Sequence, residues 1–235
     1  MSIWIDLWEL FFPRYCVVCG RRLLKAEEHL CVRCMTRLPR TRLHLQADNK
    51  MEKDLWGKMS LGRASAFLHY TQGDDSRKIL YELKYYGNSR LGIFLGRLMA
   101  NELRASGFFQ GIDCIVPVPL HEKKERQRGY NQSEMLANGI SAVTGIPVFN
   151  NLIVRTRQTE TQTHKGRAAR WENMQDVFGC TSPEAFQGKH ILLVDDVMTT
   201  GATLSLVQMP CWAYPICASV CLLWLWLATS DFYLF

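Results

Sequence analysis

One stretch, ILLVDDVMTTGATL at residues 191–204, restricts the folds open to this chain more than any other. Four apolar residues lead into two adjacent aspartates, and small or hydroxylated residues follow. The apolar run predicts a buried strand, and ligands of open α/β sheets bind outside the carboxyl ends of the strands. The sequence therefore places Asp195 and Asp196 at a rim of a sheet, where a ligand can reach them.

The residues after the two acids have the composition of a phosphate-binding loop. Glycine lets the backbone approach an anion closely, successive N–H groups can point inward, and hydroxyls add donors. A helix beginning near residue 203 would direct its positive end to the same anion, and two carboxylates suit vicinal hydroxyls or a nearby magnesium ion. The alternative is an ordinary buried strand followed by a threonine-rich helix cap. We predict a ribose 5-phosphate site whose phosphate loop is Thr199, Thr200, Gly201, Ala202 and Thr203.

The remaining chain alternates predicted strands with predicted helices. Strands are expected near residues 63–70, 112–120, 147–154 and 189–197, and helices near 75–86, 89–105 and 132–143. This alternation is typical of an α/β domain with a mainly parallel sheet. Residues 40–62 have no clear period and are assigned to a linker. An amphipathic helix is predicted over residues 3–11, docked on the main domain or, alternatively, on a membrane surface.

A cysteine quartet near the N-terminus predicts a metal site. The chain has nine cysteines, and the opening MSIWIDLWELFFPRYC lacks the basic start and continuous apolar run of an export signal. A reducing, cytoplasmic setting is therefore expected, where paired cysteines usually bind metal. The alternative is a set of reduced structural cysteines or a disulfide pair. Two Cys-x-x-Cys pairs can surround one structural zinc ion, and here they are Cys16, Cys19, Cys31 and Cys34.

Length and composition indicate a folded protein of one sizeable domain with a small satellite. Hydrophobic residues make up 48% of the 235 residues and charged residues 21%, which argues against disorder. We expect residues 1–45 to form the helix and cysteine segment and residues 46–235 the main domain. The formal net charge is +6, and residues 14–42 hold eight basic residues against two acidic ones. This window is compatible with a nucleic-acid partner or, alternatively, with a solvated face.

Two further basic segments are expected to face the phosphate loop. The first follows the strand near 112–120 as a loop, and four of its residues could converge on pyrophosphate: Lys123, Lys124, Arg126 and Arg128. The second, residues 155–178, is long and polar, which in a compact domain is typical of a functional or a disordered segment. We predict a lid that excludes water from a reactive ester and carries Arg157, Thr159 and Gln162.

Taken together, these motifs resemble the ComF/GntX family, which joins a zinc ribbon to a type I phosphoribosyltransferase domain. The resemblance rests on the cysteine quartet, LKYYGN at 83–88, VPVPL with RQRGYNQS, RTRQTETQ from residue 155, and ILLVDDVMTTGAT. It implies that Asp195 and Asp196 face the ribose hydroxyls of magnesium-bound 5-phosphoribosyl-1-pyrophosphate (PRPP), and that residues 199–203 hold the 5-phosphate. It also implies a role in competence, DNA uptake or DNA utilisation, and leaves the acceptor of the phosphoribosyl group open.

Two functions follow from this resemblance. The first is a magnesium-dependent phosphoribosyltransferase in which Asp195 has a supporting catalytic role. The second is a non-catalytic accessory protein that senses nucleotides or binds single-stranded DNA, with the zinc segment as its docking surface and DNA-processing proteins as possible partners. Strand binding usually combines basic residues with stacking aromatics, and Tyr15 is the only aromatic residue in the basic 14–42 window.

The carboxyl end departs from the family pattern. No charged residue occurs between 204 and 230, and Pro210 and Pro215 interrupt the helix that is expected to support the phosphate loop. The apolar run at 216–228 is shorter than the roughly 20 residues that span a bilayer, so no membrane partner is expected. We interpret residues 205–235 as a frameshifted or otherwise altered end in which ASVCLLWLWLA still forms the last strand.

Overall fold

The structure is a computed structural model, and it describes residues 11–70, 75–155, 178–198, 203, 204 and 207, together with the backbone of 218–226. Most of the predicted helix over residues 3–11 lies outside this part of the chain. Within it, no helix combines the length and apolar character that a membrane crossing requires.

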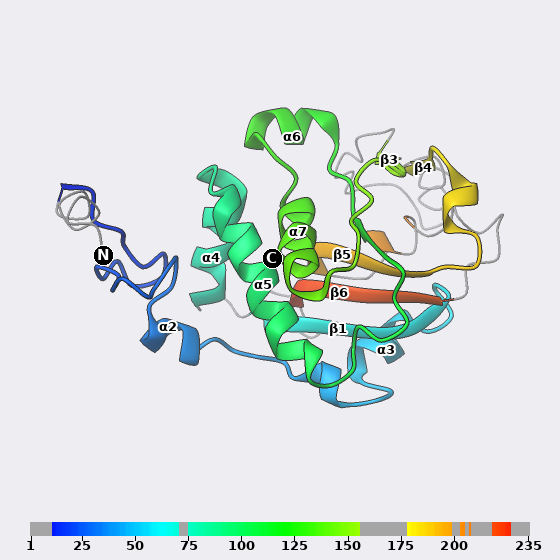
Figure 1. The fold of residues 1–235 in the computed structure, drawn as a ribbon, viewed down its shortest axis with the longest axis horizontal. Helices are drawn as coiled ribbons and strands as arrows, with labels where there is room; N and C mark the ends of the chain where they lie inside the picture. The colour runs from blue at the N-terminus through cyan, green and yellow to red at the C-terminus, as the bar shows by residue number, and fades with distance from the viewer. Residues whose placement is uncertain are drawn as a thin grey trace, which may run out of the picture.

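A four-stranded parallel sheet forms the centre of the molecule (Figure 1). Its order is β1 (Leu61–His69), β6 (Ala218–Trp226), β5 (His190–Met198) and β2 (Cys114–Pro117), and all three pairings are parallel. The predicted α/β class with a parallel sheet is therefore confirmed. The late apolar run is also confirmed as a strand, and it lies inside the sheet, paired with β1 on one side and β5 on the other.

Alternate residues of the strands pack into two hydrophobic clusters, one on each face of the sheet. In β5, Leu192 and Val194 belong to the first cluster, whereas Ile191 and Leu193 belong to the second. The first cluster is completed by α4 (Asp75–Tyr85), α5 (Ser89–Arg104) and α7 (Gln132–Thr144). Because both faces are covered, β2 and residues 191–194 of β5 are continuously apolar, as their sequences indicate.

Residues 40–62 are folded, so their assignment as a linker was wrong. They contain a 3₁₀ turn, η1 (Leu43–Leu45), and a short helix, α3 (Lys50–Leu55), whose Met51 and Leu55 are completely buried. Asn49 and Glu52 cap α3 reciprocally, and Glu52 also accepts a hydrogen bond from the Ala64 backbone N–H in β1. Two apolar residues in a six-residue helix give too weak a period to be recognised in the sequence.

Helices α5 and α7 cross at two glycines. A Cβ atom on Gly139 would lie 2.2 Å from the Ile93 carbonyl oxygen, and one on Gly96 would lie 2.1 Å from the Leu136 carbonyl oxygen. The two backbones are therefore in direct contact. This contact holds α7 against the rest of the helical layer. The start of α7 thereby reaches the carboxyl end of β5.

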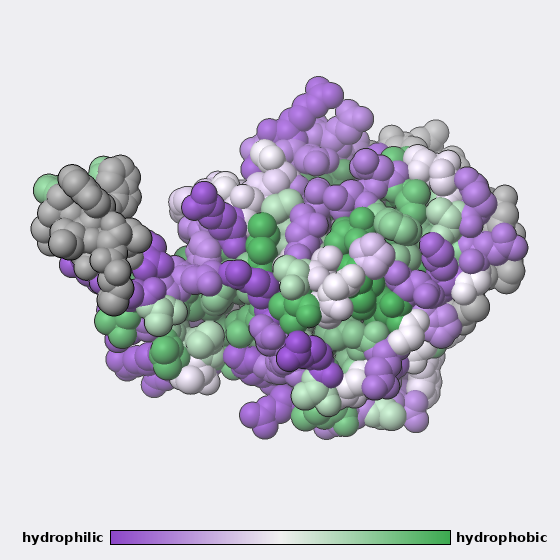
Figure 2. Space-filling model, viewed as in Figure 1, coloured by the Kyte–Doolittle hydropathy of each residue, from purple (hydrophilic) through white to green (hydrophobic). Residues whose placement is uncertain are grey.

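The segment after β2 also differs from its prediction. It was expected to be a loop, but residues Glu122–Arg128 form a helix, α6, capped by His121 at one end and by Gly129 with a φ of +82° at the other. None of its residues is buried, and Figure 2 shows a hydrophilic surface where α6 projects from the molecule in Figure 1. A helix without an apolar face has no hydrophobic period, which explains why the sequence indicated a loop.

The strand predicted at 147–154 is divided in two. Val148 forms an isolated parallel bridge with Ile115 of β2, and β3 (Ile153–Arg155) pairs in antiparallel fashion with β4 (Phe178–Cys180). A 3₁₀ turn, η2 (Pro183–Phe186), then leads to β5. Arg155 is thereby held at the end of β3, with its guanidinium 5.3 Å from the centre of the Phe178 ring.

The cysteine segment contains the short helix α2 (Val32–Thr36) and packs against α4 and α5. Lys78 donates to the Val18 carbonyl oxygen at 3.0 Å, and Arg97 lies 2.6 Å from the Glu28 carboxylate. Cys16 and Leu30 belong to the same buried cluster as α5 and α7. These contacts join the cysteine segment to the helical layer of the main domain.

Candidate functional site

A pocket of about 400 Å³ lies where β2 and β5 end. Parallel strands present their carboxyl ends at one rim, and Pro117 is paired with Val194 just before the two acids. The wall consists of residues from α4, the β2–α7 connection, β3, β5 and the segment after it: Lys84, Val118, Pro119, Leu120, Lys124, Arg128, Asn131, Gln132, Ser133, Arg155, Asp195, Asp196, Val197 and Thr203.

Asp195 is the most buried charged residue of this pocket. Its side chain accepts two hydrogen bonds at the same oxygen, Oδ1: one from the Ser133 hydroxyl at 3.1 Å and one from the Asp196 backbone N–H at 2.8 Å. Burial and the adjacent Asp196 carboxylate raise the pKa of Asp195 to about 7, although these two donors and Lys84 favour the charged form. The protonated form of Asp195 is therefore favoured more than that of an exposed aspartate.

Asp196 has a cationic partner from another part of the chain. Lys84 of α4 places its Nζ 2.9 Å from Asp196 Oδ2, and both side chains are largely buried. A partly buried ion pair of this kind is screened less by solvent than a surface pair. Lys84 was not among the predicted site residues, and its only sequence signal was the LKYYGN motif.

Three further cations line the pocket. Partial desolvation lowers the pKa of Lys124, and repulsion from Arg155, Arg128 and Lys84 lowers it further. Burial likewise lowers the pKa of Arg155, against the attraction of Asp195. Together with Lys84, four basic side chains therefore face two carboxylates, one of which is easily protonated. This arrangement has an excess of positive charge and favours an anionic ligand.

The N-terminus of α7 forms part of the same wall. Asn131 caps the helix by accepting from the Ser133 backbone N–H at 3.1 Å, and its amide donates to the Val118 carbonyl oxygen at 3.0 Å. This second bond joins the end of β2 to the start of α7. The positive end of the α7 dipole is thus directed at the pocket.

The structure brings together some of the predicted site residues and separates others. Asp195, Asp196, Arg128 and Thr203 line one pocket, together with Lys124. Lys123 and Arg126 do not line it; Arg126 pairs with Glu122 at 3.2 Å on the exposed face of α6. The rest of the phosphate loop and the lid residues lie outside the described part of the chain: Thr199, Thr200, Gly201, Ala202, Arg157, Thr159 and Gln162.

Several lining residues were not predicted from the sequence, and four of these are polar residues that act on the site directly. Lys84, Asn131, Ser133 and Arg155 all contact the acids or position the pocket wall. Each of the four belongs to one of the motifs that carry the family resemblance. The motifs therefore included these residues, but they did not indicate what each residue does. Their roles depend on chain segments that meet only in the folded protein.

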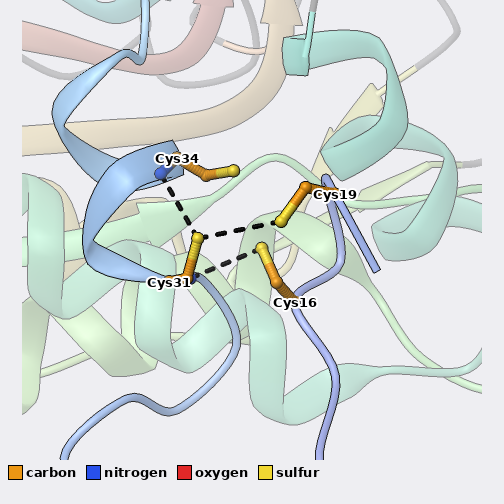
Figure 3. Close-up of side chains that lie close together, drawn as sticks. All are labelled: Cys16, Cys19, Cys31 and Cys34. Atoms are coloured by element: carbon orange, nitrogen blue, oxygen red, sulfur yellow. Dashed lines mark hydrogen bonds between the residues drawn. The ribbon is translucent and has the colours of Figure 1, made fainter. Parts of the chain in front are cut away.

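The four cysteines of the N-terminal segment converge on one point (Figure 3). Their sulfur atoms all lie within 4.8 Å of one another, and the Cys19 and Cys31 sulfurs are 3.8 Å apart. Tetrahedral thiolates at about 2.3 Å from zinc are separated by roughly 3.8 Å, so the cluster fits a metal such as zinc. Backbone N–H groups of Cys31 and Cys34 point at the Cys16 and Cys31 sulfurs, each at 3.4 Å. Gly20, directly after the first cysteine pair, has a left-handed φ of +68°.

Glu27 holds the loop between the two cysteine pairs. Its carboxylate accepts from the Leu24 N–H at 2.7 Å, the Val32 N–H at 2.8 Å and the Arg21 guanidinium at 3.0 Å. These two backbone donors lower the pKa of Glu27. The sequence identified Glu27 only as an acidic residue within a basic window. Its role could not be predicted, because the groups that donate hydrogen bonds to it lie both before and after it in the chain.

Comparison with known proteins gives a consistent group of relatives. The chain is 30% identical over 197 residues to the DNA utilization protein YhgH of Escherichia coli K12, covering 81% of this chain and 80% of that protein. It is 28% identical over 198 residues to competence protein F of Haemophilus influenzae (83% of this chain, 76% of that protein). It is 25% identical over 199 residues to competence protein ComFC of Bacillus subtilis (77% of each). No model of a known protein family matches the sequence.

Among solved structures, a similar chain is the glutamine PRPP amidotransferase of B. subtilis, complexed with ADP and GMP. The sequences are 16% identical, the TM-score is 0.40, and the similarity covers 61% of this chain and 30% of that chain.

Proposed function

Because the chain belongs to the ComF/GntX family of competence and DNA-utilisation proteins, we propose that its pocket binds PRPP or a related ribose phosphate. The observation that carries the proposal is the pair of acids, Asp195 and Asp196, facing four basic side chains at the carboxyl ends of two parallel strands. A ribose phosphate presents vicinal hydroxyls for carboxylates and anionic groups for cations. One ligand therefore satisfies both parts of the site.

The proposed ligand occupies three regions of the pocket. Its 5-phosphate lies at residues 199–203, its ribose hydroxyls donate to Asp195 and Asp196, and its pyrophosphate faces Lys124, Arg128 and Arg155. Magnesium enters with the pyrophosphate as part of the substrate. Residues 155–178, including Arg157, Thr159 and Gln162, close over the ligand and exclude water.

In the proposed reaction an acceptor attacks C1 of the ribose. The new bond forms between the acceptor and C1, the bond from C1 to the pyrophosphate oxygen breaks, and pyrophosphate leaves with the electron pair. The acceptor also releases a proton. The basic residues stabilise the charge that develops on the leaving group, so catalysis is mainly positioning and electrostatic stabilisation. With the relatives named for competence and DNA utilisation, this chemistry supports a role in competence, DNA uptake or the utilisation of DNA and nucleotides.

The Asp195→Asn/Asp196→Asn double variant tests this proposal. Both substitutions keep the size of the side chains but replace charge-assisted hydrogen bonds to the ribose with weaker ones, so we expect PRPP affinity to fall by about 100-fold or more. The measurement is calorimetric titration of magnesium-bound PRPP into zinc-loaded protein. Asp48→Asn is the matched control, because Asp48 is exposed, does not line the pocket and has a φ of +53° that asparagine tolerates. Equal affinity of the double variant and the wild type would refute the proposed site.

A second candidate function is favoured by two aromatic side chains on α4 that have basic side chains of α4 and α6 beside them. The Tyr81 and Tyr85 rings are 5.4 Å apart, and the Arg77 and Arg128 guanidinium groups lie 5.3 and 5.8 Å from them, respectively. The two tyrosines are 45% and 63% exposed. Stacked aromatics with cationic neighbours are how proteins bind single strands without sequence preference. We therefore propose α4, in place of the cysteine segment, as the surface for single-stranded DNA.

The Tyr81→Ala/Tyr85→Ala variant is expected to bind a fluorescent oligo(dT) about 10- to 100-fold more weakly, because one or two stacking contacts are lost. Fluorescence anisotropy at low salt, repeated at increasing salt, measures this affinity and its electrostatic part. Tyr15→Ala, at the exposed aromatic residue of the cysteine segment, is the control and should leave binding unchanged. If Tyr15→Ala weakens binding and the α4 variant does not, the surface is the cysteine segment. Absence of binding at low salt would eliminate this function.

A further inference from the structure

The two acids of the pocket are held in different ways. Asp196 is paired with Lys84, whose Nζ is 2.9 Å from its carboxylate. Asp195 is buried and is anchored by a neutral donor, the Ser133 hydroxyl, and by its neighbour's backbone N–H. The orientation of the Asp195 carboxylate therefore depends on Ser133, whereas that of the Asp196 carboxylate depends on Lys84.

Ser133 is placed so that its hydroxyl donates to Asp195. It is the second residue of α7, it is only 4% exposed, and its backbone N–H is already satisfied by the side chain of Asn131. The hydroxyl then reaches across from α7 to Oδ1 of Asp195 on β5. Both hydrogen bonds end at Oδ1, and among the described residues no donor to Oδ2 is found. The second oxygen remains for a ligand.

We infer that Ser133 is a positioning residue for the ribose-binding carboxylate, which it anchors through Oδ1 so that Oδ2 is presented to a ligand hydroxyl. This inference rests on the proposed function, because it supposes that a hydroxyl of the ligand donates to Asp195. A ligand hydroxyl that donates a hydrogen bond needs an acceptor oxygen, which the ionised carboxylate provides. Ser133 supports this state because a hydroxyl that donates to a carboxylate favours the ionised form.

The charged groups around Asp195 determine how its ionisation responds to the loss of Ser133. Asp196, next to it on β5, disfavours the negative charge, whereas Lys84 of α4 and Arg155 of β3 favour it. Lys124 of α6 interacts with Asp196. Without the Ser133 hydroxyl, one group that favours the ionised form of Asp195 is lost. Burial and the Asp196 carboxylate would then raise the pKa of Asp195 further. Ligand affinity should therefore increase with pH as Asp195 ionises, and this increase should occur at higher pH when Ser133 is replaced.

The first test needs no ligand. Asp195 is titrated by carboxyl ¹³C NMR between pH 5 and 9, with Asp195→Asn to assign its signal, in the wild type and in Ser133→Ala. We expect the midpoint to rise by about half a pH unit to one pH unit in Ser133→Ala, the size that one lost hydrogen bond corresponds to. Ser133→Thr should restore a midpoint near that of the wild type. Ser141→Ala, the same substitution further along α7 and outside the pocket, should leave it unchanged. An unmoved midpoint in Ser133→Ala would overturn the inference.

The second test measures magnesium–PRPP affinity over the same pH range. We expect Ser133→Ala to bind severalfold more weakly below the new midpoint and to approach wild-type affinity above it. A purely structural effect would weaken binding equally at every pH, and that result would also overturn the inference. If the wild type does not bind PRPP at all, the proposed function fails, but the NMR titration still decides whether Ser133 governs the ionisation of Asp195.

Discussion

Replacing Cys31 with serine is expected to abolish zinc binding and unfold residues 14–42. Cys31 lies at the centre of the cluster: its sulfur is 3.8 Å from that of Cys19 and accepts from the Cys34 backbone N–H. Structural zinc contributes roughly 10 to 16 kcal/mol of apparent binding free energy to small domains, which a segment this short cannot replace by burial. Loss of one thiolate should therefore remove most of the folding free energy of this segment.

The measurements are zinc content per chain and hydrogen exchange of the segment's amides. In Cys31→Ser we expect a zinc content below one ion per chain. We also expect fast exchange at the amides of Gly20 and Val17, which donate to the Cys16 and His29 carbonyl oxygens, respectively. Cys180→Ser is the matched control, because Cys180 is a half-buried free cysteine of β4 outside the cluster. One zinc ion per chain and unchanged protection in Cys31→Ser would contradict the assignment of the metal site.

Replacing Gly139 with alanine is expected to destabilise the protein by about 1 to 3 kcal/mol, the usual cost of overpacking. The new Cβ would lie 2.2 Å from the Ile93 carbonyl oxygen and 2.8 Å from the Gly96 Cα. No side-chain rotation can relieve this clash, because the atoms involved are a Cβ and backbone. The substitution would also displace α7, whose first turn carries Ser133, so affinity for PRPP should fall as well.

Urea denaturation measures this change, and Ala142→Gly isolates the part that comes from helix propensity. Ala142 is exposed on the same helix, and introducing glycine there should cost about 1 kcal/mol. By propensity alone, Gly139→Ala should be stabilising by a similar amount. A stabilised Gly139→Ala protein would show that α5 and α7 are not in backbone contact.

The sequence predicted the central sheet and its acidic rim because these depend on local patterns. The apolar run before Asp195 is long enough to define β5, and the acids follow it directly, so strand and site are encoded in one segment. The four thiols of the cysteine cluster were equally predictable, because the spacing of two Cys-x-x-Cys pairs already limits their geometry.

Lys84 and Arg155 show why the rest of the site could not be predicted. They lie 40 or more residues from Asp195 in the sequence, and they approach the two acids only because α4 and β3 flank the same end of the sheet. Nothing in their local sequence distinguishes them from solvated basic residues such as Lys123, which lies on the exposed α6. Long-range topology, and not composition, selects the basic residues that line the pocket.

The position of β6 was the least expected feature. Its apolar residues suggested the last strand, but the uncharged composition and the two prolines before it suggested an altered end. Nevertheless, its backbone pairs with β1 from Leu61 to His69 and with β5 from His190 to Met198. A strand paired on both sides is integral to the sheet, so removal of residues 218–226 would separate β1 from β5.

The most direct test of the central claim is titration of the zinc-loaded wild-type protein with PRPP and with its two parts, ribose 5-phosphate and pyrophosphate, all with magnesium. If the acids bind the ribose hydroxyls and the basic residues bind the pyrophosphate, PRPP should bind more tightly than either part, and each part should displace it. Failure of PRPP to bind, or binding no tighter than that of pyrophosphate alone, would contradict the account, because the pocket would then be only a general anion site.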